Sequence, residues 1–384
     1  METVLTDDFQ VFIKPVGARC NLQCSYCYYT KTNNIYNPDI KPVMSDETLE
    51  NCIKQHYLAS SGDTVLFTWH GGEPLLAGID FYKKALSIQK KRLPQGKQFL
   101  NGIQTNGTMI TKEWCDFFAI HRFIVGISMD GPEVFHNAMR RTTNQCGSFE
   151  KTLAGYRLLR EYGINPEILC AVNSWNVNHP LDVYNFFKML GANYITFLPV
   201  VEKRNSESGE VSQESVPAFE FGLFLSAIFD EWVKKDIGVV KIQIFEEALR
   251  TAFNQEHSLC IFKERCGGVP VIEHNGDFYS CDHFVEKHRP LGTVNERCLE
   301  YFLNHPAQKA FGDAKWNTLP PYCLRCEVRK MCNGECPKNR FIPSPDGDPG
   351  LNYLCEGYKY FFAHCKPFVE AVATVWGIGN RELF

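Results

Sequence analysis

The sequence lacks any run of about 18 apolar residues, the length that a membrane-spanning helix needs. Its first eight residues contain no lysine or arginine and no long apolar stretch, so we expect no secretory leader. The net charge is only −4, from 40 basic and 44 acidic residues, which gives no bulk electrostatic attraction for nucleic acid. Internal repeats and low-complexity tracts are also missing. We therefore expect a cytoplasmic protein that binds neither a membrane nor nucleic acid.

Cysteine, by contrast, is abundant, with 17 residues in a chain of 384. Because disulfides are disfavoured in a reducing compartment, clustered cysteines there more often bind metal or do chemistry. Eleven of them form three groups: Cys20, Cys24 and Cys27; Cys260, Cys266 and Cys281; and Cys323, Cys326, Cys332, Cys336 and Cys355. We expect the six scattered ones to be ordinary buried or half-buried residues: Cys52, Cys115, Cys146, Cys170, Cys298 and Cys365.

The first cysteine group follows a short apolar run that ends at Ile13 and is closed by Pro15 and Gly17. The group therefore lies on the loop after a first strand. Three thiolates can hold three irons of a cubane cluster and leave the fourth iron open for a substrate, whereas an electron-transfer cluster normally takes four. The alternative is a zinc knuckle, but zinc sites close with four ligands, and the nearest histidine is His56, beyond a helix-like segment.

Strand-like and helix-like segments alternate from residue 9 to about residue 250. The strand-like runs are Val11–Lys14, Thr64–Trp69, Phe99–Gln104, Phe123–Ser128, Glu167–Val172 and Tyr194–Leu198. The helix-like segments are Ser45–Ala59, Asp80–Arg92, Lys112–Ile120, Ser148–Glu161, Asp182–Leu190 and Pro217–Lys235. Six such units predict an α/β fold with parallel strands, a partial (β/α)6 barrel of the TIM type rather than a complete one of eight. Ser45 suits a helix start, and Gly163 and Gly191 stand at helix ends.

Polar and glycine-rich segments follow three of these strands. They are His70-Gly71-Gly72-Glu73-Pro74, Gln104-Thr105-Asn106-Gly107-Thr108 and Ser128-Met129-Asp130-Gly131-Pro132, the last followed by Arg140 and Arg141. In parallel α/β folds, chemistry gathers on the loops at the C-terminal ends of the strands. Glycine there lets a ligand approach the backbone closely. These segments and the first cysteine group therefore predict one binding rim.

Beyond about residue 255 the alternation stops and cysteine, glycine and proline take over. Asn275-Gly276 is a strong hairpin signal. The eight cysteines of the second and third groups match the number that two four-thiolate clusters need, and two structural zinc sites are the alternative. Asp282 follows Cys281 directly, so its carboxylate is either a proton acceptor beside a redox centre or an ordinary surface group. His283 is a second candidate for the acceptor.

The spacing Cys20-x3-Cys24-x2-Cys27, with Tyr26 before the last cysteine, resembles the radical S-adenosylmethionine (SAM) superfamily. Gly71-Gly72-Glu73-Pro74 is similar to the superfamily's methionine-amine motif, and the C-terminal cysteines resemble the SPASM domain with its two auxiliary [4Fe-4S] clusters. From about residue 9 to 370 the chain resembles anaerobic sulfatase-maturating enzymes. Besides the segments above, the matching residues are Lys14-Pro15, Cys27-Tyr28-Tyr29, Tyr279-Ser280-Cys281-Asp282-His283-Phe284, Cys332-Asn333-Gly334-Glu335-Cys336-Pro337-Lys338-Asn339-Arg340 and Leu351-Asn352-Tyr353-Leu354-Cys355.

The resemblance implies two domains, a radical SAM partial barrel over residues 1–250 and a SPASM domain with a C-terminal helix over residues 251–384. It implies three [4Fe-4S] clusters, held by Cys20, Cys24 and Cys27; by Cys260, Cys266, Cys281 and Cys336; and by Cys323, Cys326, Cys332 and Cys355. It further implies SAM contacts at Gly71, Gly72, Glu73, Ser128, Arg140 and the backbone near Tyr29, substrate contacts at His70, Gln104 and Asn106, and Asp282 as the catalytic base. Some relatives carry Gln at the position of His70.

The implied reaction oxidises a Cys or Ser side chain, within a Cys/Ser-x-Pro/Ala-x-Arg segment of a sulfatase, to Cα-formylglycine. A 5′-deoxyadenosyl radical takes a hydrogen atom from the substrate β-carbon, the base removes the thiol or hydroxyl proton, and an auxiliary cluster accepts the electron. The implied partners are an unfolded or nascent sulfatase polypeptide and a reduced electron donor of the flavodoxin or ferredoxin type.

Two alternatives remain open at this point. One is a SPASM peptide maturase that forms thioether or carbon–carbon crosslinks in a precursor peptide; the first strand begins near residue 9, which leaves no room for the N-terminal peptide-recognition domain that would favour it. The other is a non-catalytic iron–sulfur electron-transfer or zinc-binding scaffold. The incomplete ligation at Cys20–Cys27 and the Gly71-Gly72-Glu73 segment argue against the scaffold.

Overall fold

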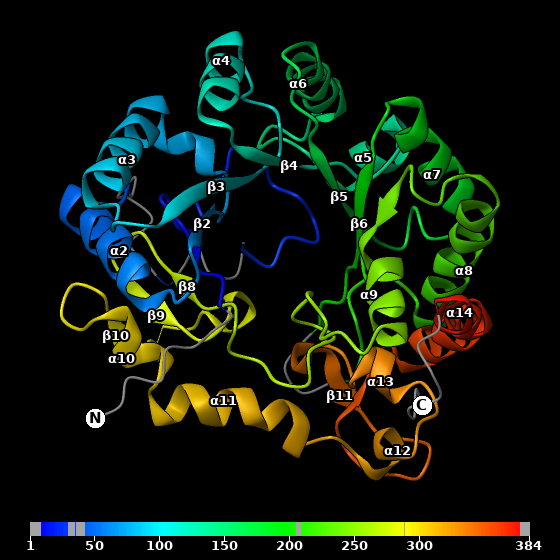
Figure 1. Cartoon of the computed structure of the whole chain (residues 1–384). Helices are drawn as coiled ribbons and strands as arrows, with labels where there is room; N and C mark the ends of the chain where they lie inside the picture. The colour runs from blue at the N-terminus through cyan, green and yellow to red at the C-terminus, as the bar shows by residue number, and fades with distance from the viewer. Residues whose placement is uncertain (1–8, 30–34, 36–42, 205–208, 288, 377–384) are drawn as a thin grey trace. The chain divides into compact units, whose positions relative to one another are not determined.

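The computed structural model describes residues 9–29, 35, 43–204, 209–287 and 289–376 (Figure 1). The chain divides into two compact units, and both are discontinuous in sequence. The first unit comprises Met1–Ser128, Arg140–Pro166 and Gly267–Gly312, and the second comprises Met129–Met139, Glu167–Cys266 and Asp313–Phe384. Within the described residues, no helix has both the length and the apolar character that crossing a bilayer requires.

The first unit contains a sheet that joins distant parts of the sequence. Its strands are β1 (Phe12–Ile13), β2 (Thr64–Trp69), β3 (Gln98–Thr105), β4 (Ile124–Ser128), β8 (Val271–Ile272), β9 (Asp277–Tyr279) and β10 (Gly292–Thr293). Their order is β10-β9-β8-β1-β2-β3-β4. The pairs from β8 to β4 are parallel, and those from β8 to β10 are antiparallel. The parallel pairing of β8 with β1 places the loops after these two strands at the same edge of the sheet.

Helices cover one face of this sheet. They are α2 (Asp46–Ala59), α3 (Ile79–Arg92), α4 (Lys112–His121), α6 (Phe149–Glu161) and α10 (Leu299–Leu303), with 3-10 turns η1 (Pro74–Ala77) and η2 (Asp282–Phe284); α11 (Pro306–Asn317) contributes residues to both units. Figure 1 shows α2 and α3 beside β2. Phe67 of β2 packs edge-on against Tyr57 of α2, and Trp69 packs against Tyr82 of α3. Alternate residues of β2 are therefore core residues, as a strand's two-residue period requires.

The second unit combines a small parallel sheet with a cysteine-bearing region. Its strands are β5 (Glu167–Val172), β6 (Tyr194–Pro199) and β7 (Lys241–Ile242), all parallel, and an antiparallel pair, β11 (Arg340–Ile342) and β12 (Leu351–Asn352). Its helices are α5 (Glu133–Met139), α7 (Pro180–Met189), α8 (Ala218–Lys235), α9 (Gln243–Ala252), α12 (Pro321–Leu324), α13 (Arg329–Cys332) and α14 (Cys355–Val375), with the 3-10 turn η3 (Pro337–Asn339).

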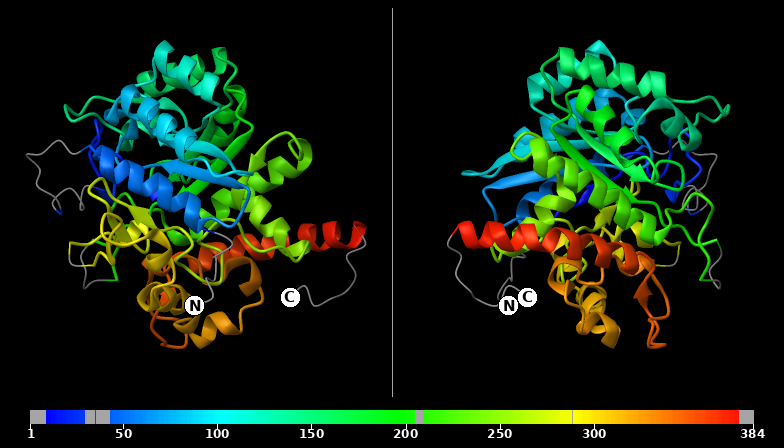
Figure 2. Two further views of the ribbon diagram at one scale, coloured as in Figure 1. Left: turned by 60° about the vertical axis from the view of Figure 1, so that its left-hand side comes forward. Right: turned by 90° about the vertical axis from the view of Figure 1, so that its right-hand side faces the viewer.

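Helix α14, drawn in red, runs without a break through Pro367 (Figure 2). It crosses α8 where Gly222 and Gly357 meet. A Cβ atom on Gly357 would lie 2.0 Å from the carbonyl oxygen of Ala218, and one on Gly222 would lie 2.4 Å from that of Gly357. Two glycines at the crossing therefore let the helix backbones touch, and this contact anchors the helix that begins at Cys355.

The six predicted strands and six predicted helices are confirmed, with ends that differ by at most two residues. Ser45 Oγ accepts a hydrogen bond from the Thr48 amide (3.1 Å), as a helix cap should, and Gly163 and Gly191 have φ of 75° and 72° after α6 and α7. The predicted hairpin turn joins β8 to β9, with Gly276 at φ 92°. The domain boundary at residue 250 stays a prediction.

Two features differ from the sequence-based expectations. The strand β7 was not predicted because a two-residue strand carries almost no periodic signal; the ten-residue helix α9 was also missed, although its apolar residues recur with the helical period. Four of the scattered cysteines are buried, but the expectation is wrong for Cys146 and Cys298, which are exposed. Both lie outside regular elements or at a helix cap, where the chain does not cover the side chain.

Candidate active site

The first cysteine group lies on the loop that follows β1. Cys20, Cys24 and Cys27 are all half-buried, and a turn closes between them because the Cys27 amide donates to the Cys24 carbonyl (3.1 Å). The Leu22 amide lies 3.4 Å from Cys20 Sγ. Burial raises the pKa of the Cys20 thiol to about 12, and the charge of Glu73 adds to the effect. The free thiol is therefore protonated at neutral pH, and binding iron must release that proton.

Gly71 and Gly72 pack directly against this loop. The Gly72 amide donates to the Gly17 carbonyl (2.9 Å), and the Glu73 amide donates to the Arg19 carbonyl (2.8 Å). A Cβ atom on Gly72 would lie 2.2 Å from the Arg19 oxygen, and one on Gly71 would lie 2.6 Å from the Gly17 oxygen. The glycines therefore admit the backbone of the cysteine loop itself, a role that the sequence analysis did not assign to them.

The carboxylate of Glu73 is buried, and both of its oxygens accept hydrogen bonds from the protein. Oε1 accepts from the Leu75 amide (3.0 Å) and the Thr105 hydroxyl (2.8 Å), and Oε2 accepts from the Asn106 amide (2.8 Å). Burial raises its pKa to about 7, against the lowering effect of these donors. Glu73 thus connects the end of β2 to the end of β3, and so holds two of the predicted binding segments together.

Asn106 and Gln104 turn toward protein partners. The Asn106 amide nitrogen lies 3.7 Å from Cys20 Sγ and donates to Asn21 Oδ1 (2.8 Å). Gln104 donates to Ser128 Oγ (3.1 Å), and its side chain occupies the space above Gly126, where a Cβ atom would lie 2.1 Å from Gln104 Oε1. The ends of β3 and β4 are therefore linked to each other and to a cysteine ligand candidate.

Arg140 lies beside the cysteine loop as well. Its guanidinium group stands 5.5 Å from the ring centroid of Tyr26, a cation–π distance, and its side chain is buried. The next residue binds the same loop, because the Gln23 amide donates to the Arg141 carbonyl (2.7 Å). Arg140 and Arg141 therefore both lie against the cysteine loop, and the role of Arg140 as a SAM contact stays a prediction.

Asp282 is the centre of a buried polar cluster in the same unit. Lys14 Nζ lies 2.5 Å from Oδ1, and the hydroxyls of Tyr28 and Tyr29 donate to Oδ2 at 2.5 Å each. Lys14, at the end of β1, is fully buried and also binds Glu273 (2.9 Å), which follows β8. Asp282 is therefore not a surface carboxylate, so the alternative reading of it is wrong.

The charge of Lys14 decides the ionisation of Asp282. Burial alone would raise the pKa of the carboxyl group, but Lys14 and the donated hydrogen bonds hold that pKa well below its usual range. Asp282 is therefore ionised at neutral pH. His70 reaches the same cluster through its Nδ1, 3.0 Å from the Tyr29 hydroxyl, and burial lowers the pKa of its imidazole, which favours the neutral ring.

Sequence reasoning missed Lys14, Tyr28 and Glu273 as members of this cluster. The only available signal was a lysine that ends an apolar strand, since a charge at such a position needs a partner. The partner could not be identified, because it depends on the pairing of β8 with β1.

Four cysteines of the second unit line one cavity. They are Cys323, Cys326, Cys332 and Cys355, the set that the resemblance assigns to one auxiliary cluster. Cys336 does not line that cavity; it interacts electrostatically with Lys315, as do Cys260 and Cys266. The grouping supports the implied assignment of Cys336 to the other cluster. Cys281, the remaining member of that set, belongs to the first unit and precedes Asp282.

The spacing of these thiols bears on the zinc alternative. In the part of the chain that the structure describes, no three His, Cys, Asp or Glu side chains converge as the ligands of a single metal ion do. Zinc draws its sulfur ligands to about 2.3 Å from one centre. Thiolates on a cubane cluster each bind a different iron, so a cluster site does not require its thiols to converge on one point.

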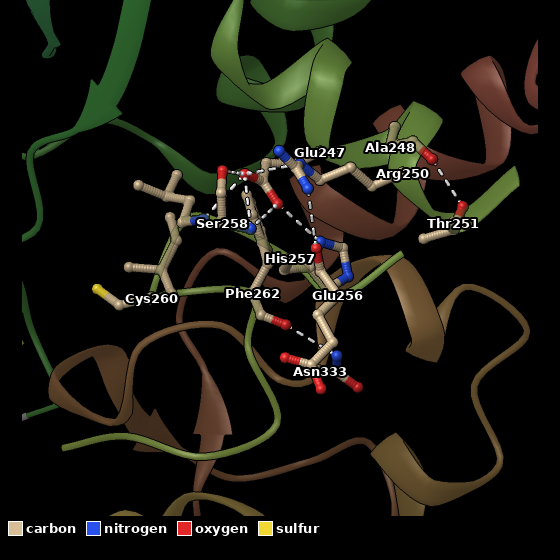
Figure 3. Close-up of polar contacts among 12 residues, drawn as sticks. Glu247, Ala248, Arg250, Thr251, Glu256, His257, Ser258, Cys260, Phe262 and Asn333 are labelled. Carbon is tan, nitrogen blue, oxygen red and sulfur yellow. Dashed lines mark hydrogen bonds and ion pairs between the residues drawn. The ribbon is translucent and has the colours of Figure 1, made fainter. Parts of the chain in front are cut away.

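The loop that carries Cys260 is held by a buried carboxylate, Glu247 of α9 (Figure 3). Glu247 lies 2.9 Å from His257 Nδ1 and accepts from the amides of Ser258 and Leu259. The other nitrogen of His257 lies 2.8 Å from the carbonyl oxygen of Lys330, in α13, which ends at Cys332. The Cys260 loop and the Cys332 helix are thus fixed to each other within the second unit.

Comparison with known proteins decides the family. The pattern of the Radical SAM superfamily matches residues 15–186, and that of the iron–sulfur cluster-binding SPASM domain matches residues 260–327. The chain is 43% identical over 373 residues to a serine-type anaerobic sulfatase-maturating enzyme of Bacteroides thetaiotaomicron, an alignment that covers 94% of this chain and 90% of the relative. The chain belongs to the anaerobic sulfatase-maturating enzymes.

Further members of the family agree. A cysteine-type anaerobic sulfatase-maturating enzyme of Clostridium perfringens is 30% identical and covers 95% of this chain and 98% of its own length. A solved structure described as native anSMEcpe with bound AdoMet and Cp18Cys peptide has 29% identity, a TM-score of 0.86, and coverage of 95% of this chain and 99% of that one. The resemblance and the α/β fold class predicted from the sequence are therefore confirmed. The ligand and contact residues of this sulfatase-maturating family member stay predictions.

Proposed function

We propose that this chain oxidises a Cys or Ser side chain of a sulfatase polypeptide to Cα-formylglycine. One structural observation carries the proposal: Asp282, a buried and ionised carboxylate, accepts a hydrogen bond from Tyr28, the residue directly after Cys27. A proton acceptor thus stands beside the first cysteine group. The similarity to serine-type and cysteine-type sulfatase-maturating relatives along almost the whole chain supports this substrate class over the cross-linking of a precursor peptide.

The cofactors in this proposal are SAM and three [4Fe-4S] clusters. Cys20, Cys24 and Cys27 would hold the SAM-binding cluster, because they offer three soft donors on one half-buried loop. The auxiliary clusters would be held by Cys260, Cys266, Cys281 and Cys336, and by Cys323, Cys326, Cys332 and Cys355. When bound, SAM and its cluster supply the 5′-deoxyadenosyl radical that takes a hydrogen atom from the substrate β-carbon.

Asp282 would act as the base that takes the substrate's thiol or hydroxyl proton. An ionised carboxylate offers about four lone-pair sites. Oδ2 accepts from Tyr28 and Tyr29, whereas Oδ1 forms an ion pair with Lys14 and accepts no hydrogen bond, so the proton would be received at Oδ1. The lowered pKa makes Asp282 a weak base. The transfer therefore requires a substrate whose proton has become acidic, as happens when the adjacent carbon loses a hydrogen atom.

The SAM contacts of this chain are part of the same proposal. Gly71, Gly72 and the backbone of Glu73 would meet the methionine amine, Ser128 and Arg140 the carboxylate or ribose, and the backbone near Tyr29 the adenine. The positions of Ser128 next to Gln104, and of Arg140 over Tyr26, support this assignment. His70, Gln104 and Asn106 are proposed to contact the peptide; the hydrogen bond of Asn106 to Cys20 adds a role in orienting that cysteine.

The electron donor is proposed to be a reduced flavodoxin- or ferredoxin-type protein, and the site of action the cytoplasm. Clusters and 17 cysteines suit a reducing compartment, where thiols stay unpaired. The sulfatase would be met as an unfolded or nascent polypeptide, since its target side chain must reach a buried carboxylate.

The proposal is tested by anaerobic incubation of the cluster-loaded protein with SAM, a strong reductant and a peptide of the sequence class Cys/Ser-x-Pro/Ala-x-Arg. The expected product is an aldehyde at the Cys or Ser, detected by mass spectrometry and by capture with a hydrazide. A matched peptide with Ala at that position should remain unchanged. SAM cleavage in which the Cys and Ser peptides also remain unchanged would reject this substrate class.

A further inference from the structure

Two cations of the second unit are enclosed without a carboxylate within ion-pair distance among the described residues. Lys315, at the end of α11, is fully buried, and its ammonium group donates to the carbonyl oxygens of Cys260 (3.0 Å) and Ile261 (2.7 Å). Arg340, at the start of β11, is half-buried and donates to backbone carbonyl oxygens alone: those of Gly334, Asn333, Glu335 and Lys315. Backbone dipoles satisfy the hydrogen bonds but leave two full positive charges without a counter-charge.

Glu335 interacts electrostatically with both Lys315 and Arg340, but it forms no ion pair with either. Its Oε2 accepts hydrogen bonds from Asn339 (3.0 Å) and Asn352 (2.5 Å). An isolated charge is costly to bury unless an opposite charge lies near it. The enclosed ammonium and guanidinium groups therefore point to a negative partner that is not an acidic side chain.

The groups that these cations face are thiols. The Lys315 ammonium group interacts electrostatically with Cys266, Cys336 and Cys260. Arg340 interacts with Cys323 and Cys332, and also with Cys266. The thiols around Lys315 all belong to one proposed auxiliary cluster, whereas those around Arg340 come from both clusters.

Four thiolates on a [4Fe-4S] core give a net negative charge, which grows by one when the cluster accepts an electron. Net charge and hydrogen bonding around a cluster set its reduction potential. We infer that Lys315 and Arg340 are the built-in counter-cations of the two auxiliary clusters, and that they raise the reduction potentials by stabilising the reduced state. The inference rests on the proposed function, because that function makes the clusters resident. The cations then help the auxiliary clusters to take the electron that leaves the substrate.

The test compares Lys315→Met with Lys315→Arg, which keeps the charge. Both are made in a background with Cys20→Ala, Cys24→Ala and Cys27→Ala, so that the auxiliary clusters alone give a signal in a redox titration followed by electron paramagnetic resonance. Lys315→Met should lower the reduction equilibrium constant of one auxiliary cluster at least about tenfold, about 59 mV for one electron, while Lys315→Arg changes it less than threefold. An unchanged potential in a fully iron-loaded Lys315→Met protein would overturn the inference.

If Lys315→Met does not keep its clusters, the iron contents of the Met, Gln and Arg variants are compared instead of the potential. Lys315→Gln can still donate one hydrogen bond to the Ile261 carbonyl without a charge, and its potential should fall as well. If both neutral variants lose iron while Lys315→Arg keeps it, the charge is required and the inference stands. If Lys315→Arg also loses iron, shape rather than charge matters and the inference fails. None of these readouts uses SAM cleavage or a peptide, so they are independent of whether the proposed reaction occurs.

Discussion

Lys14 Nζ lies 2.5 Å from Asp282 Oδ1, in a contact from which solvent is almost excluded. The lysine directly follows β1, and the aspartate begins the 3-10 turn η2, directly after Cys281. The pair forms because β8 lies beside β1 in the sheet. It keeps Asp282 ionised and, through Tyr28, adjacent to the first cysteine group.

Asp282→Asn removes the proposed base and retains the shape of the side chain. Peptide oxidation should fall at least about a hundredfold, the usual contribution of a general base, while SAM cleavage falls much less. The measurement is the ratio of aldehyde formed to 5′-deoxyadenosine formed under anaerobic conditions. Glu273→Gln, which changes the other carboxylate on Lys14, is the control and should keep most of that ratio. An equal loss of both products in Asp282→Asn would reject the role.

Lys14→Met leaves Asp282 and Glu273 buried without their cation. Breaking a buried ion pair in this way typically costs about 3–5 kcal/mol, because an uncompensated charge remains. We expect a loss of that size in the free energy of unfolding, measured with urea under anaerobic conditions. Lys84→Met removes an exposed partner of Asp46 and should change the stability by less than about 0.5 kcal/mol. Similar stabilities for the two variants would contradict the importance assigned to the buried pair.

Gly72→Ala tests the contact between the glycine motif and the cysteine loop. The new Cβ atom would lie 2.2 Å from the Arg19 oxygen, so the backbone next to Cys20 has to move. We expect the variant to lose about a third of its iron, the share of the three-cysteine cluster, together with SAM cleavage. In Gly62→Ala the Cβ atom would meet the Thr64 oxygen at 3.9 Å, an ordinary contact, and iron content should not change. Full iron content in Gly72→Ala would refute this view of the motif.

His56 makes stability depend on pH. Burial in α2 lowers the pKa of its imidazole from 6.5 to about 3. Below about pH 6.5 the unfolded chain binds a proton that the folded protein does not, so stability falls as the pH falls, by up to about 1.4 kcal/mol per pH unit. Urea unfolding at pH 7, 6 and 5 should show this fall in the free energy of unfolding. In His56→Gln the free energy should fall less steeply with pH, whatever its value at pH 7. Equal slopes in the two proteins would show that other groups cause the dependence.

The sequence made the alternating strands and helices predictable because their apolar residues recur with regular periods. Other features depend on pairings that no local pattern encodes. The Lys14–Asp282 pair requires β8 to lie beside β1, and the hairpin signal at Asn275-Gly276 does not say which strand the hairpin joins. Gly72 was predicted to let a ligand approach, but its nearest contact is the Arg19 backbone. A glycine indicates that another group approaches the backbone closely, but it does not show whether that group is a ligand or the protein itself.

The central claim is that the protein takes a hydrogen atom from the β-carbon of a Cys or Ser in a sulfatase peptide. The most direct measurement uses a peptide deuterated at that carbon alone, incubated anaerobically with SAM, reductant and the cluster-loaded protein. We predict that the 5′-deoxyadenosine formed contains one deuterium and that the peptide carries a formylglycine. Two results would contradict the account. One is formylglycine formed together with unlabelled 5′-deoxyadenosine, and the other is SAM cleavage that gives only unlabelled 5′-deoxyadenosine.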